Sequence, residues 1–79
     1  MKLGSLRAID AFVRLGGTGE AAQGLGISQS AVIKTLRQAE EELDLSLATT
    51  AQGRLVPTPE AHSLVRQAQP LFGALRRAR

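Results

Sequence analysis

The 79-residue sequence predicts a single, mainly α-helical domain with a three-helix core, a β-hairpin and a C-terminal helix. Apolar residues recur at three- and four-residue spacing in separate stretches, which are bounded by capping residues or glycines. One pair of short strand-like runs flanks a loop that contains glycine. Aromatic residues make up only 3% of the chain, so the core must consist mainly of aliphatic side chains and alanine. Such a core favours closely packed helices.

The first predicted helix covers residues 5–15. Leu6, Ile9 and Phe12 fall on one helical face, and Ser5 is a suitable N-terminal cap. Gly16 ends the helix, because glycine tolerates the left-handed geometry of a helix C-terminus.

A short second helix is predicted to begin at Thr18, its N-cap, and to end at Gly26. Ala21 and Ala22 give it a face of small side chains, which lets a neighbouring helix approach closely. We expect Ile27 to be buried in the tight turn that follows.

The third helix begins after Ser28, another capping residue, and ends near Leu43 and Asp44. Its buried face is predicted from a stripe that repeats every three to four residues and comprises Val32, Leu36, Ala39 and Leu43. The acidic cluster of residues 40–42 is expected to lie on a solvated face.

Residues 46–57 predict a β-hairpin. Leu47–Thr49 and Leu55–Val56 are short strand candidates on either side of a loop that contains Gly53. The last helix is predicted to start at Thr58, its N-cap, because Pro59 and the acidic Glu60 follow in the first turn.

A heptad pattern runs through the last helix, with further apolar residues beside it. Pro70 interrupts the pattern, and a kink or break is expected near Gln69. The apolar stripe could pack on its own domain, but its width favours a subunit interface in a homodimer. The predicted interface residues are Ala61, Leu64, Val65, Ala68, Leu71, Phe72 and Leu75.

Residues 18–43 form the pattern of a helix-turn-helix, since a short helix, a tight glycine turn and a longer helix follow one another. In that motif the start of the second helix meets base edges in the DNA major groove. The exposed face of the longer helix suits this role, because it carries Gln29, Ser30, Ile33, Lys34 and Arg37. Gln29 can bond adenine, Ile33 can touch a thymine methyl, and the cations can meet phosphates or guanine.

The hairpin that follows is predicted to be a wing. Arg54 near its tip is expected to contact the DNA backbone or the minor groove. Thr18 and Ser28 complete the predicted DNA-binding residues, although the hydroxyl of Ser28 is first of all a helix cap. The sequence therefore predicts a winged helix-turn-helix that binds double-stranded DNA.

Composition argues against other classes of protein. Ten Lys and Arg residues against seven acids give a net charge of +3, a mild basic bias compatible with nucleic acid. The chain has no cysteine and a single histidine, His62, and it shows no nucleophile set or phosphate-binding glycine loop. We therefore expect no enzyme activity, no metal and no cofactor. The sequence has no apolar run long enough to span a membrane and no secretory signal, so a cytoplasmic location is expected.

Residues 3–79 resemble the N-terminal DNA-binding domain of the LysR-type transcriptional regulators. The resemblance is carried by Leu6-Arg7-Ala8, by Ala21-Ala22 with Leu25, by residues 27–32, and by Leu36, Glu40, Glu42-Leu43 and Leu47. It implies a DNA-binding domain over residues 1–57 and a linker helix over residues 58–79 that pairs with a second subunit. It also implies a small-molecule effector bound by a further C-terminal domain, which lies outside these 79 residues.

The sequence departs from the usual family pattern at several positions. Glu20 stands where a basic residue is usual, Thr50 replaces a wing arginine, and Pro70 has no usual counterpart. Two alternatives therefore stay open. One is a winged helix used for protein–protein interaction, and the other is a DNA-binding domain of the molybdate-regulator type.

Overall fold

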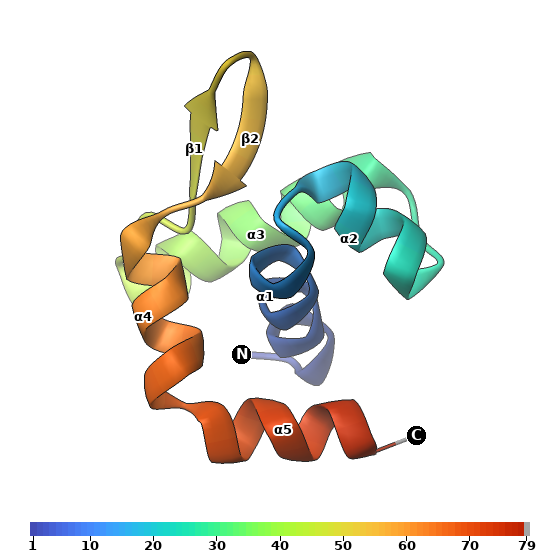
Figure 1. Cartoon of the computed structure of the whole chain (residues 1–79), viewed down its shortest axis with the longest axis vertical. Coiled ribbons are helices and arrows are strands. Elements are labelled where there is room, and N and C mark those ends of the chain that lie inside the picture. The colour runs from blue at the N-terminus through green and yellow to red at the C-terminus, as the bar shows by residue number, and fades with distance from the viewer. Residues whose placement is uncertain (79) are drawn as a thin grey trace.

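The computed structural model describes residues 1–78 and contains five helices and a two-stranded antiparallel sheet in that part of the chain (Figure 1). The elements in order are α1 (Leu3–Leu15), α2 (Thr18–Leu25), α3 (Gln29–Leu43), β1 (Ala48–Ala51), β2 (Arg54–Pro57), α4 (Pro59–Gln67) and α5 (Gln69–Arg77). The predicted mainly α fold, with a three-helix core and a wing, is confirmed. No helix within residues 1–78 is both long and apolar enough to cross a membrane.

Helix α1 lies at the centre of the molecule and packs against α2, α3, α4 and α5 (Figure 1). Its Ile9 and Phe12 are fully buried, and Val32 and Leu36 of α3 meet them in one hydrophobic core. Phe72 of α5 belongs to the same core. The core is therefore shared between the helix-turn-helix and the C-terminal helices.

Glycines and hydroxyl caps set most helix ends. Gly16 and Gly26 adopt the left-handed conformation, with φ of 86° and 71°, after α1 and α2. Ser28 Oγ accepts from the Ala31 amide at 3.1 Å, and Thr58 Oγ1 accepts from the Ala61 amide at 3.0 Å. These four predictions are confirmed.

Two predicted N-caps are shifted. Helix α1 begins at Leu3 because the amides of Ser5 and Leu6 already bond to the Lys2 carbonyl, so Ser5 lies inside the helix and is buried. In α2 the cap is Gly17, and Thr18 is the first helical residue.

The prediction that Ile27 is buried in the turn is wrong, since its exposed fraction is 45%. Its amide bonds to the Ala22 carbonyl. The apolar contact at this end of α2 is made instead by Leu25, which is partly buried against the core.

The hairpin has a two-residue turn at Gln52 and Gly53, which both have positive φ, 54° and 77°. This backbone matches the twist of a tight antiparallel hairpin. At its base the Thr58 amide donates to the Leu47 carbonyl, and the Thr58 hydroxyl donates to the Ser46 carbonyl at 2.6 Å. The wing is therefore fixed to the start of α4.

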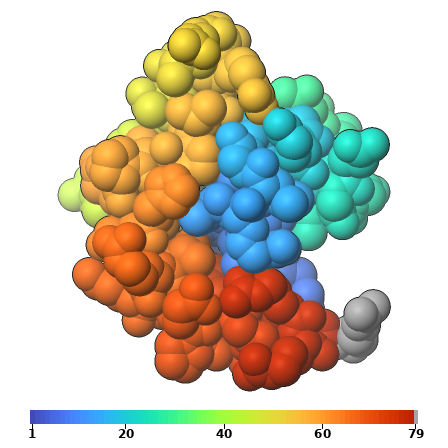
Figure 2. Space-filling view, in the orientation of Figure 1, coloured from blue at the N-terminus to red at the C-terminus, as the bar shows by residue number. Residues whose placement is uncertain are grey.

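The last helix is broken into α4 and α5 at Ala68, where φ is −103° and ψ is 27°. Pro70 sits in the first turn of α5, where its missing amide costs nothing, whereas inside one long helix it would clash with the preceding turn. The expected break is thus confirmed. Helix α5 turns back and packs beside α1 (Figure 1; red beside blue in Figure 2).

This arrangement corrects the predicted apolar seam of the last helix. The side chains of Ala61, Val65, Phe72 and Leu75 are buried in the chain's own core. Leu64 and Ala68 are partly buried, and Leu71 is 48% exposed. The break and the return of α5 divide the heptad pattern, so it does not form one continuous outer surface.

Candidate nucleic-acid interface

A groove of about 450 Å³ lies where the wing meets the starts of α2 and α3. It is lined by Thr18, Gly19, Glu20, Gln29, Ile33, Gly53, Arg54 and Leu55. Four of the predicted DNA-binding residues therefore come together from three elements that are separate in the sequence. In Figure 1 the wing projects from the helical body on the side of α2 and α3.

The polar face of α3 follows from the opposite, buried face. Because Val32, Leu36 and Ala39 point into the core, the intervening residues are turned outward. Ser28, Gln29, Ser30, Lys34 and Arg37 are all exposed, whereas Ile33 is half-buried in the groove.

Gln29 is held in place by Thr18. Its Nε2 donates to Thr18 Oγ1 at 2.8 Å, and Thr18 itself is only 4% exposed. A primary amide has two N–H donors and a carbonyl acceptor, so one donor and the acceptor of Gln29 remain for a ligand. That pair is what bidentate bonding to adenine requires.

Beside Gln29, the hydroxyls of Ser28 and Ser30 lie 3.3 Å apart. Ser28 Oγ also caps α3 through the Ala31 amide. Ser30 therefore has the freer hydroxyl of the two for contact with a base or a phosphate.

The prediction that residues 40–42 form a solvated face is wrong for Glu40, which is partly buried. Its Oε1 accepts from Arg37 Nη1 at 2.8 Å, and its Oε2 accepts from the amides of Leu47 and Ala48 at 2.7 and 3.2 Å. Partial burial acts to raise the pKa of Glu40, but these hydrogen bonds outweigh it and the pKa lies below its ordinary value. Glu40 thus joins α3 to the wing.

Arg54 carries an ion pair that sequence reasoning missed. Its Nη2 lies 2.7 Å from Oε2 of Glu20, across the groove on α2. The pKa of Glu20 is lowered, first by a hydrogen bond from its own backbone amide and then by the hydrogen bond from Arg54. The sequence offered only the opposite charges, because residues 34 positions apart show no helical spacing.

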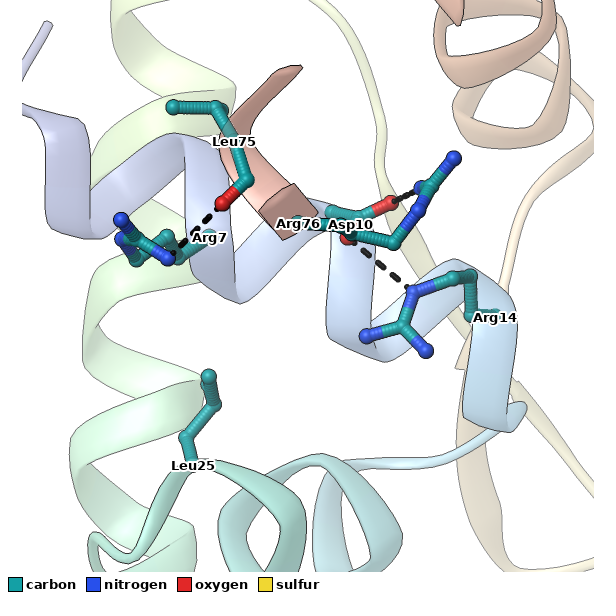
Figure 3. Close-up of a pocket in the computed structure, with 6 residues that line it drawn as sticks. All are labelled: Arg7, Asp10, Arg14, Leu25, Leu75 and Arg76. Atoms are coloured by element: carbon teal, nitrogen blue, oxygen red, sulfur yellow. Dashed lines mark hydrogen bonds and ion pairs between the residues drawn. The ribbon is translucent and has the colours of Figure 1, made fainter. Parts of the chain in front are cut away.

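A second cluster joins α1 to α5 beside a cavity of about 310 Å³ (Figure 3). Asp10 is 3% exposed and accepts from Arg14 Nε at 3.0 Å and from Arg76 Nη1 at 2.5 Å. Arg7 Nη1 donates to the Leu75 carbonyl at 3.1 Å. The spacing of Asp10 and Arg14 signals an ion pair within one helix, but not the bond to Arg76.

Within the described residues, no group of three or more His, Cys, Asp or Glu side chains is arranged to hold a metal ion. The groove combines polar, charged and apolar side chains.

A short helix, a tight turn, a longer helix with an outward polar face and a following wing define a winged helix-turn-helix domain. Residues 3–62 match the family model for the bacterial regulatory helix-turn-helix proteins of the LysR family. The chain belongs to this family, as its sequence resemblance indicated.

Two curated relatives are similar over most of the chain. It is 33% identical over 76 residues to the transcriptional regulator DgcR of Pseudoalteromonas sp, and 36% identical over 72 residues to AdmX of Serratia plymuthica. These matches cover 96% and 91% of the chain but only 26% and 24% of the relatives. The chain thus spans about a quarter of their length.

Solved structures show the same architecture. The BenM DNA-binding domain in complex with benA site 1 DNA matches with a TM-score of 0.80 and 28% identity, over 98% of this chain and 86% of that one. A probable transcriptional regulator from Pseudomonas aeruginosa matches with a TM-score of 0.81 and 31% identity, over 98% of this chain and 26% of that one.

Proposed function

We propose that the chain is the sequence-specific DNA-binding domain of a LysR-type transcription regulator. The observation that carries this proposal is the convergence of Thr18, Gln29, Ile33 and Arg54 on one groove. The fold that builds the groove is similar to a domain solved in complex with DNA. In this proposal the first half of α3 enters the major groove and the wing lies along the backbone or minor groove.

Each predicted DNA-binding residue has a role that fits its chemistry. Gln29 bonds adenine, Ser30 bonds a base or a phosphate, and the half-buried Ile33 contacts a thymine methyl. Lys34, Arg37 and Arg54 neutralise phosphates, and the cations of α3 can also bond guanine. Ser28 orients the start of α3, and Thr18 orients Gln29.

We also propose a homodimer, because one helix in one half-site gives little affinity and a two-fold dimer contacts a palindromic site. The interface uses the exposed part of the C-terminal region rather than the whole predicted stripe. Leu45 and Leu64 line an apolar depression of about 230 Å³ with Glu60, Ser63 and Gln67, and Leu71 is exposed at the start of α5.

In the complete regulator, a separate domain would bind the small-molecule effector and control this module. Such a regulator acts on DNA in the cytoplasm. The activity of the domain is binding rather than catalysis, and it uses neither a cofactor nor a metal.

Selection from a random double-stranded oligonucleotide library tests the function. We expect enrichment of a motif with two related half-sites.

Gln29→Ala should relax the preference at one base pair of each half-site, at a cost of about 1–3 kcal/mol for the matched sequence. Gln38→Ala is the matched control, since Gln38 is exposed on α3 but does not line the groove. If no sequence is enriched, this function is wrong, and a winged helix for protein–protein interaction takes its place.

A further inference from the structure

The ion pair between Glu20 and Arg54 crosses the mouth of the proposed DNA groove. The two side chains meet at 2.7 Å and are 48% and 58% exposed, so both are within reach of a ligand in solution. Both residues line the same groove as Gln29 and Ile33. The wing cation proposed to meet the DNA backbone thus already has an anionic partner within the protein.

The pair rests directly on the backbone at Gly17. A Cβ atom added at Gly17 would lie under 3.0 Å from Glu20 Oε1 and from Arg54 Nη2. The φ of Gly17 is −168°, an extended conformation that any residue adopts. A side chain at Gly17 would therefore displace the exposed ends of the ion pair, whereas the backbone conformation would accept it.

The carboxylate of Glu20 sits where an anion is favoured. Glu20 lies in the first turn of α2, next to the positive end of the helix dipole. Arg54 supplies a guanidinium from the opposite side. Backbone amides at a helix N-terminus together with an arginine are also the donors that bind phosphate oxygens.

We infer that Glu20 is an internal competitor of the DNA phosphate, because its carboxylate occupies the donor on Arg54 that a backbone phosphate would take. The inference rests on the proposed DNA-binding function. On binding, a phosphate oxygen replaces the carboxylate on Arg54, and Glu20 moves into solvent. The exchange lowers affinity for every sequence alike, because no base edge is involved, and the order of base preference stays with α3.

A double-mutant cycle tests the competition directly. Wild type, Glu20→Gln, Arg54→Ala and the double variant are titrated with the selected duplex at several salt concentrations. Glu20→Gln removes both the competition and the plain repulsion from phosphates when Arg54 is present, but only the repulsion when Arg54 is absent. We therefore expect Glu20→Gln to tighten binding about 2- to 5-fold more in the Arg54 background than in the Arg54→Ala background, the range that an exposed ion pair gives.

Glu41→Gln is the matched control for net charge. Glu41 is exposed on α3 and does not line the groove, so its loss should change affinity by the same small factor in both backgrounds. An effect of Glu20→Gln that is equal in the two backgrounds, or no larger than that of Glu41→Gln, would overturn the inference and leave the DNA-binding function standing.

A measurement without DNA tests the ion pair independently of the DNA-binding function. NMR titration of the Glu20 carboxyl group in the free protein should show its pKa rising toward the ordinary value in Arg54→Ala. The same rise is expected in Gly17→Ala, where the new methyl displaces the pair without changing any charge. If the titration of Glu20 is unchanged by Arg54→Ala, the pair does not form in solution and the inference fails. If wild type and Glu20→Gln both fail to bind any duplex at low salt, the DNA-binding function itself fails, and the inference with it.

Discussion

Glu40 shows how one side chain can connect two functional elements. It accepts from Arg37 on its own helix and from the amides of Leu47 and Ala48 at the entrance to the wing. A glutamine at this position would present an amide N–H group to one of those donors. We expect Glu40→Gln to lower the free energy of unfolding by about 1–3 kcal/mol at pH 7, as measured by urea denaturation.

The pH dependence of this effect has a defined sign. The pKa of Glu40 is lowered in the folded protein from its ordinary value of 4.5, so its contribution is fully present above that value. It is lost as the pH falls through the lower folded pKa, and the difference between wild type and Glu40→Gln should shrink there. Glu41→Gln is the control, and a destabilisation by Glu40→Gln that persists unchanged at the lowest pH would contradict the ionised role of Glu40.

Lys34 tests the electrostatic part of the proposed interface at the same scale. Its ammonium group is exposed on the outward face of α3, one turn after Ser30. A phosphate contact releases counterions, so Lys34→Ala should flatten the slope of log affinity against log salt by about 1. Lys2 lies near the N-terminus and does not line the groove, so Lys2→Ala should leave the slope unchanged. Equal slopes for wild type and Lys34→Ala would place this side chain away from the DNA backbone.

At the level of elements, the capping residues of α3 and α4 make different numbers of hydrogen bonds. Ser28 caps α3 with one exposed hydrogen bond, whereas the buried Thr58 caps α4 and also donates to the Ser46 carbonyl at the base of the wing. Thr58→Ala should therefore cost about 1–2 kcal/mol, more than Ser28→Ala, in thermal or urea unfolding. Thr58→Ser keeps both hydrogen bonds and should recover most of the loss. If Thr58→Ala is no worse than Ser28→Ala, the bond to Ser46 adds nothing to stability.

A buried acid joins α5 to α1. Asp10 accepts from Arg14 and from Arg76, and the second bond joins residues 66 positions apart. Asp10→Asn should reduce stability by about 1–3 kcal/mol and loosen α5, which amide hydrogen exchange of residues 69–77 would detect. Asp44→Asn is a matched control, because Asp44 is an exposed left-handed C-cap that asparagine tolerates well. Unchanged exchange in α5 would show that its apolar contacts alone hold it.

Local sequence signals predicted the helices and strands. The packing of these elements against one another depends on tertiary contacts, which the sequence pattern did not reveal. The turn glycines, the caps Ser28 and Thr58 and the break near Pro70 follow from the conformations that single residues favour. The direction of α5 after the break does not, because it depends on Phe72 and Leu75 finding α1. The polar face of α3 was likewise visible from periodicity, whereas the partners of Glu40 and Arg54 lie on other elements and have no periodic signature.

For the whole molecule, the apolar residues of the C-terminal helices are divided between the core and the surface. Phe72 and Leu75 complete the core of a small domain, which has little apolar surface to spare. Leu71 is largely exposed, and the partly buried Leu64 lines a depression together with Leu45 of the loop between α3 and the wing. A second copy that covers these leucines would bury apolar area at no cost to the core.

In the proposed homodimer, the interface therefore depends on the outer leucines. We expect sedimentation equilibrium at micromolar concentration to show a dimer for wild type and a monomer for Leu64→Asp or Leu71→Asp, because a carboxylate in an apolar interface loses its hydration. Leu3→Asp is the control, since Leu3 is 53% exposed in the first turn of α1, where an acid suits the helix dipole. Circular dichroism must show that the variants stay folded, which is expected because neither leucine belongs to the fully buried core. A wild-type protein that sediments as a monomer, with both variants unchanged in mass, would show that the isolated chain has no interface at this surface.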